Sequence, residues 1–241
     1  MACAGNANNQ MLPSFKNHTA IALLFVSALS LTAAAQTPAP NTTEWENEAL
    51  KLRLFYPSDL VKGDVSQVMQ DGKLSLFGIS GTSDPKLAEA THCLRPALLL
   101  ELPQSVASQN PAVTATVLLA ELDVECLNAE HESTSTTLLN NLAEIVNKVP
   151  GMKSIAQPAT YTIGWQKLHM AAAQGQPQTS GPASAQLYTM GLSTNWNSHL
   201  LVWYFSSNSV DTLNRITKTT VRFGRDQAAP LYPLTIGNAT P

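Results

Sequence analysis

The chain has 241 residues, of which 13% are charged, and its formal net charge is −3 at pH 7. A nucleic-acid-binding surface needs clustered lysine and arginine, and a slightly acidic chain with 14 basic residues does not fit that class. A chain of this length can bury a sizeable core without metals or disulfides, so a single domain is the simplest expectation.

The first 35 residues have the pattern of a secretory signal peptide. Lys16 is their only charged residue, an apolar run follows at residues 20–31, and the small residues Ala33 and Ala35 come next. Signal peptidase cleaves after such small residues. The apolar run is too short to cross a bilayer core of about 30 Å as a stable helix. We therefore expect cleavage near Ala35 and a periplasmic or secreted protein with no remaining membrane span; an uncleaved anchor is the alternative.

The rest of the chain divides into three parts. Residues 36–47, rich in proline and threonine, predict a disordered lead-in. Residues 48–225 predict one globular domain, and residues 226–241 predict an extended tail that contains prolines. Both Met1 and Met11 fit as the start of translation.

Alternating apolar and polar residues predict a series of β-strands, separated by turns rich in Pro, Gly, Ser and Asn. The expected strands are residues 50–56, 74–79, 97–102, 114–126, 160–174, 185–193, 199–205 and 221–223. The strand at 199–205 is apolar on both faces, so we expect it to be central in the sheet and covered on both sides.

Two segments have helical spacing of their apolar residues. The first is residues 137–148, which Pro150 and Gly151 terminate, and the second is residues 209–220, capped by Asn208 or Ser209. Antiparallel strands with two intervening helices predict the α+β class: an antiparallel β-sheet with helices packed against it, as an αβα sandwich.

Cys93 and Cys126 are the two cysteines that remain after cleavage. An even number of cysteines in an oxidising compartment favours a disulfide, which would stabilise the fold by roughly 3 to 4 kcal/mol. On a strand at 114–126, Cys126 falls on the apolar face and points inward. Buried free thiols and half of a metal site are the alternatives, although neither cysteine has a second one at C-x-x-C spacing.

The order of these elements resembles a known family. The resemblance rests on short segments at residues 55–60, 163–165, 195–197 and 221–223. With the central helix, they resemble the PsbP/Mog1-like group, which includes the bacterial envelope proteins DcrB and LpqN. The resemblance extends over about residues 50–223. It implies a small αβα sandwich that binds or assists other proteins and has no shared catalytic site.

A secreted hydrolase with a dispersed active site is the enzymatic alternative. It would need a histidine within reach of a nucleophile and a carboxylate, and the candidates are His92, His131, His169 and His199. No nucleophile motif accompanies them, since residues 78–81 lack the G-x-S-x-G spacing. We assign no catalytic residue and no cofactor.

Glu121, Asp123 and Glu125 form the local cluster best suited to a cation. Three carboxylates on one strand face could ligate a hard metal ion, which raises a third hypothesis, a cation-dependent adhesion or scaffold domain. The same alternation is also typical of the solvated side of a strand. No metal-binding motif accompanies it, and we assign no metal site.

Trp196 lies between two asparagines in an expected turn. We expect its indole to be partly exposed, where it either contacts a partner or caps the edge of the core. Together these patterns favour an exported, non-enzymatic binding or accessory protein of the cell envelope. Its partner would be an unknown envelope protein or a small ligand, and the secreted hydrolase remains the alternative.

Overall fold

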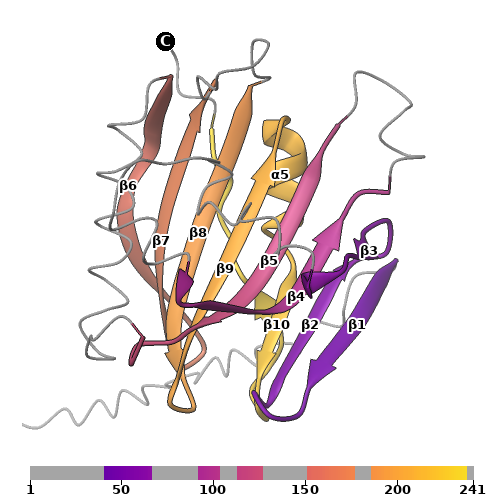
Figure 1. Ribbon diagram of the computed structural model, residues 1–241, viewed down its shortest axis with the longest axis vertical. Coiled ribbons are helices and arrows are strands. Elements are labelled where there is room, and N and C mark those ends of the chain that lie inside the picture. Colours follow the sequence, from indigo (N-terminus) through magenta and orange to yellow (C-terminus); the bar gives the residue numbers. More distant parts are fainter. Residues whose placement is uncertain (1–40, 67–91, 104–112, 127–150, 177–185, 238–241) are drawn as a thin grey trace, which may run out of the picture. The chain divides into compact units, whose positions relative to one another are not determined.

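The computed structural model describes residues 41–66, 92–103, 113–126, 151–176 and 186–237. These residues form two antiparallel β-sheets and one α-helix (Figure 1). No helix within these ranges is long and apolar enough to cross a membrane.

The smaller sheet has four strands in the order β1-β2-β10-β11. Their bounds are β1 Thr42–Asn47, β2 Leu52–Pro57, β10 Thr220–Phe223 and β11 Ala229–Pro230. β1 pairs along the whole of β2, with Thr42 opposite Pro57 and Asn47 opposite Leu52. Half of the segment expected to be a disordered lead-in is therefore a strand, and Trp45 in its middle packs partly against the core.

The larger sheet has seven strands in the order β3-β4-β5-β9-β8-β7-β6, and every neighbouring pair is antiparallel. Their bounds are β3 Val61–Lys62, β4 Leu94–Glu101, β5 Ala115–Leu122, β6 Met152–Ile163, β7 Gln166–Gly175, β8 Leu187–Trp196 and β9 His199–Ser207. The segment at 160–174, expected to be one strand, is a hairpin that turns at Gly164 and Trp165.

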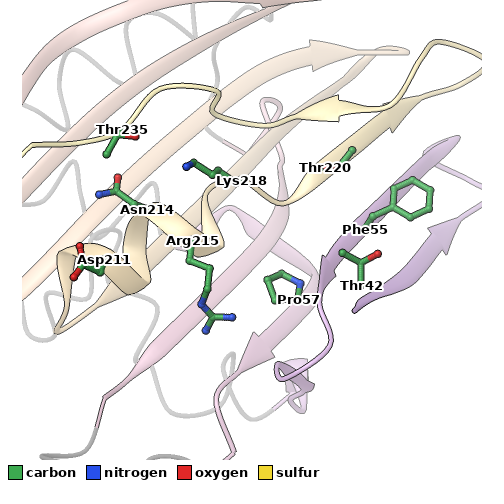
Figure 2. Close-up of a pocket in the computed structure, with 9 residues that line it drawn as sticks. All are labelled: Thr42, Phe55, Pro57, Asp211, Asn214, Arg215, Lys218, Thr220 and Thr235. Carbon is green, nitrogen blue, oxygen red and sulfur yellow. The ribbon is translucent and has the colours of Figure 1, made fainter. Parts of the chain in front are cut away.

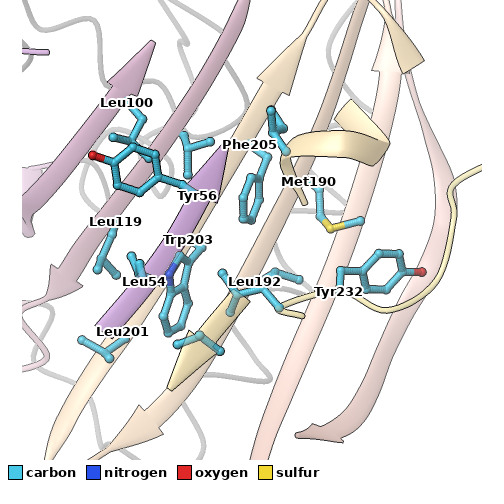
Figure 3. Packing of buried hydrophobic residues seen from close by; sticks show 14 of the residues in the cluster. Leu54, Tyr56, Leu100, Leu119, Met190, Leu192, Leu201, Trp203, Phe205 and Tyr232 are labelled. Carbon is cyan, nitrogen blue, oxygen red and sulfur yellow. The ribbon is translucent and has the colours of Figure 1, made fainter. Parts of the chain in front are cut away.

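The core lies where the two sheets pack against each other. Alternate side chains of β2 and β10 point toward one face of the large sheet, because successive residues of a strand point to opposite sides. Figure 3 shows Leu54 and Tyr56 of β2 beside Trp203 and Phe205 of β9. The Trp203 ring meets Phe223 of β10 edge to face, with ring centroids 6.2 Å apart. Aromatic and aliphatic side chains from both sheets thus form one continuous cluster.

The expected α+β class, an antiparallel sheet with helices packed against it, is wrong. The structure is mostly β-sheet, with two antiparallel sheets and a single short helix in the described residues. On the inner face of the large sheet, the smaller sheet provides much of the apolar cover that helices were expected to give. The helix expected at 137–148 and the strand expected at 74–79 lie outside the described residues.

The described helix, α5, spans Val210–Ile216. Ser209 is its N-cap, and the Ser209 side chain accepts a hydrogen bond from the Thr212 N–H. Leu213 and Ile216 are buried, as the helical spacing predicted, and α5 packs against β9, β5 and β8. The helix ends earlier than expected because β10 begins at Thr220 and continues the small sheet.

The opposite face of the large sheet is also buried at its centre. Leu200, Val202 and Tyr204 of β9 point away from the small sheet, yet each is buried. The expectation that residues 199–205 form a central strand covered on both sides is confirmed.

The segment after β11 lies alongside the residues that come directly after α5. The Leu231 N–H donates to the Thr219 carbonyl at 2.8 Å, and the Tyr232 N–H donates to the Thr217 carbonyl at 3.0 Å. Leu231 and Tyr232 are both buried. The described part of the expected tail is therefore packed onto the domain.

The two outer strands of the large sheet are both irregular or short. β3 contributes two residues, while the pairing of β6 with β7 shifts register between Ser154 and Ala156 and again between Ala156 and Ala159. The second shift spans Pro158, a residue with no backbone N–H to donate.

Candidate functional site

The predicted cysteine pair is brought together. Cys93 precedes β4 and Cys126 follows β5, their Cα atoms are 5.6 Å apart, and their sulfurs lie at disulfide distance. Cys93 is buried, but Cys126 is exposed rather than inward-facing. The difference arises because β5 ends at Leu122, so the alternation of strand faces does not continue to residue 126.

The early end of β5 also separates the three acidic residues. The Glu121 Oε1 atom lies 2.8 Å from Nδ1 of His199 on the neighbouring strand. Asp123 forms an ion pair with Arg95 instead. Glu125 is exposed in the turn that follows. The three carboxylates therefore do not converge, and the described residues contain no group of three or more metal-ligating side chains that could hold an ion.

Asp123 has a structural role in this turn. Its Oδ1 atom accepts the N–H groups of Glu125 and Cys126, each at 3.1 Å. The hydrogen bond from Cys126, together with the charge of Arg95, lowers the pKa of the Asp123 carboxyl. The carboxylate thus fixes the backbone beside the cysteine pair.

The described histidines lie apart from one another. His92 is exposed, and His199 pairs with Glu121. His169 is buried on β7, with its Nδ1 atom 2.9 Å from Oγ1 of Thr160. Burial and the charge of Lys167 lower the pKa of His169. His199 therefore contacts a carboxylate, whereas His169 contacts a hydroxyl. His131 lies outside the described residues.

Trp196 caps the edge of the core. It is half-buried at the end of β8, and its Nε1 donates to the Leu50 carbonyl at 2.8 Å. Its ring packs on Phe223 with centroids 5.2 Å apart. Gly224 lies beneath the indole with φ +58°, a left-handed conformation that favours glycine. The turn itself lies one position later, at Asn197 and Ser198.

Trp165 is the exposed tryptophan. Its side chain is 94% exposed at the tip of the β6–β7 hairpin. Gly164 before it has φ +56°, a left-handed conformation that favours glycine in such a two-residue turn. The Gln166 side chain donates to the Asn195 carbonyl at 2.7 Å, which fixes the tip to β8. A glycine followed by a large residue between two alternating runs is the sequence signal for this turn.

A second feature is an open pocket of about 410 Å³ between α5 and the outer face of the small sheet (Figure 2). Its walls are formed by α5, by the neighbouring strands β1 and β2, and by part of β10. The lining residues are Thr42, Phe55, Pro57, Asp211, Asn214, Arg215, Lys218, Thr220 and Thr235.

The charges at this pocket come mostly from the helix side. Arg215 donates through Nη1 to Asp59 at 2.7 Å. Lys218 is exposed and has no ion-pair partner among the described residues. At the strand side, the Arg222 guanidinium lies 5.7 Å from the centroid of the Phe55 ring. The pocket therefore has an aromatic floor beside basic side chains and one acidic side chain, Asp211.

Comparisons with known proteins give a likeness in structure but none in sequence. No protein-family model matches the chain, and no curated protein matches it in sequence. The structure is similar to the solution structure of cyanobacterial PsbP (CyanoP) from Synechocystis sp. PCC 6803, at 9% sequence identity and a TM-score of 0.42. The similarity covers 81% of this chain and 98% of that one.

Proposed function

We propose that this protein is a non-enzymatic binding protein that acts outside the cytoplasm, as an accessory to another envelope protein. The observation that carries the proposal is the exposed indole of Trp165 on a fixed hairpin. For Trp196 the sequence left a partner contact and a cap on the core edge open; its ring packs on Phe223, and we place the partner contact at the exposed Trp165.

The exposed indole provides a large binding surface at low entropic cost. A tryptophan buries about 150 to 250 Å² when a partner covers it. The β6–β7 pairing and the Gln166 hydrogen bond already fix the backbone, so binding requires little ordering of the chain. Tryptophan is accordingly one of the residues that dominate binding energy in protein interfaces.

The surroundings of Trp165 favour a protein partner over a bilayer. Lys167 is exposed two residues along β7. The Asp226 carboxylate lies 4.0 Å from the Cβ position of Gly164. An aromatic side chain with charges of both signs around it matches the rim of a protein interface, whereas anionic lipids would attract basic residues alone.

Two observations support a location outside the cytoplasm. The cysteine pair at disulfide distance fits an oxidising compartment, and residues 1–35 have the signal-peptide pattern. N-terminal sequencing of the protein that accumulates in the cell checks this, with Gln36 as the expected first residue. A non-enzymatic role is supported by the contacts of the histidines. His169 lies beside a hydroxyl, but the carboxylate lies beside a different histidine, His199.

A photo-crosslinking amino acid at position 165 tests the proposed function in the producing cell. We expect one adduct of defined mass, absent when the same group replaces Lys153, which is exposed on β6. Excess unlabelled protein should suppress the adduct, and excess W165A protein should not. Equal crosslinking from both positions would overturn the proposal. So would flotation of the purified protein with phosphatidylglycerol vesicles that depends on Trp165.

A further inference from the structure

The pocket beside α5 combines unequal charges with an apolar floor, and it shares no residue with the Trp165 hairpin tip. Its volume of about 410 Å³ lies within the range of small-ligand sites, roughly 300 to 1,000 Å³. We propose that it binds a small organic anion with one negative charge, a carboxylate attached to a flat apolar group. This inference goes beyond the proposed function and does not depend on it.

The carboxylate would lie between Arg215 and Lys218. The Lys218 N–H donates to the Arg215 carbonyl at 3.3 Å, and the side chains of both residues line the pocket. Asp59 takes one donor of Arg215, and a guanidinium has five. Lys218 has no acidic partner within the ranges that the structure describes. Donors for one carboxylate therefore remain on both side chains.

The apolar group would lie on Phe55 and Pro57. Figure 2 shows both rings on the strand side of the pocket, across from α5, which bears Arg215, and from Lys218 in the segment that follows α5. Arg222 lies above the Phe55 ring, and its Nε is buried without a hydrogen-bond partner. Arg222 thus places a cation beside the aromatic ring, while Arg53 on the same strand as Phe55 pairs with Glu44 and Glu46.

Asp211 limits the charge that the pocket accepts. It lies in the first turn of α5 and lines the same pocket as the two basic residues. Its carboxylate repels a ligand anion, and Asp59 already balances part of the Arg215 charge. Lys218 remains the basic side chain of the lining without an ion pair among the described residues, which matches one negative charge on the ligand.

The test uses the full chain, expressed with its own N-terminal segment and purified in the form that accumulates in the cell. Benzoate is the probe, benzyl alcohol is its uncharged counterpart, and amide shifts in nitrogen-15 NMR spectra report binding. We expect benzoate to shift the amides of Phe55, Lys218 and Thr220 and to bind at least fivefold more tightly than benzyl alcohol, roughly the effect of one exposed charge pair.

Three variants make the test specific. Lys218→Ala should weaken benzoate binding about fivefold, and Lys153→Ala, a matched change on β6 away from the pocket, should leave it unchanged. Asp211→Asn should act in the opposite direction and strengthen binding about twofold or more, because it removes a repulsive charge. Equal affinity for the two probes, or equal effects of the two lysine variants, would overturn the proposal. Each variant's spectrum shows directly whether it is folded.

Discussion

Asn214 binds the backbone of Ile236 through both ends of its carboxamide. Its Nδ2 donates to the Ile236 carbonyl at 3.0 Å, and its Oδ1 accepts the Ile236 N–H at 2.7 Å. Both residues are buried. One side chain of α5 thus satisfies two backbone groups of the C-terminal segment, as a neighbouring strand would.

Replacing Asn214 by alanine should destabilise the protein by about 2 kcal/mol, because two buried backbone groups lose their partners. Urea unfolding measures the change. Thr235→Ala, an exposed position in the same segment, serves as the control and should cost less than about 0.5 kcal/mol. A loss for Asn214→Ala no larger than that of the control would show that the hydrogen bonds contribute little.

Replacing Cys93 and Cys126 together by serine should lower the free energy of unfolding by roughly 3 to 4 kcal/mol. The two residues are 33 positions apart in the sequence, and a crosslink over such a loop restricts the unfolded chain by about that amount. Thermal unfolding with and without a reductant gives the comparison. The serine variant should be insensitive to the reductant, whereas equal sensitivity in both proteins would contradict a Cys93–Cys126 bond.

Substituting Trp196 should lower the stability of the protein, whereas substituting Trp165 should leave the stability almost unchanged. Trp196→Ala should destabilise by about 3 kcal/mol or more, since it removes the packing on Phe223 and leaves the Leu50 carbonyl without its donor. Trp165→Ala should change stability by less than about 0.5 kcal/mol, because its side chain is almost fully exposed. Denaturant unfolding of both variants decides this, and a large loss for Trp165→Ala would place that indole in the core.

Stability should fall in mildly acidic solution because of His169. Its pKa is lowered in the folded protein, so the unfolded chain takes up the proton first as the pH falls through about 6.5. The penalty grows down to the folded-state pKa, and above both values it is absent. Comparing melting temperatures at pH 7.5 and pH 5 should show a smaller drop for His169→Gln than for the unchanged protein. His92→Gln, at an exposed site, should keep the full drop.

The strands were largely predictable, and the hairpin at Gly164 was missed for a specific reason. The inward residues of β6 include Tyr161 and Ile163, whereas those of β7 are Leu168 and Met170. The inward positions change from odd to even numbers across the turn, which a single strand cannot do. Attention to that change of phase would have separated the two strands and corrected part of the fold class.

The candidate site was less predictable, because a tryptophan near polar residues fits either exposure or packing. Trp196 donates a hydrogen bond to the Leu50 carbonyl and packs on Phe223, and the two residues are distant from each other in the sequence. The Trp165 side chain, at the end of its hairpin, stays almost fully exposed. The pocket likewise joins Phe55 to Lys218, a long-range relationship that local spacing does not report.

The irregular outer strands of the large sheet bear on how the protein behaves at high concentration. A long, regular outer strand offers a row of free N–H and C=O groups to which another copy can add its own strand, and repeated addition produces fibrils. β3 is too short to template such growth, and the shifted register and proline of β6 interrupt the row of donors. Among the described residues, copies crowded into one compartment thus meet a very short strand at one side of this sheet and an interrupted strand at the other.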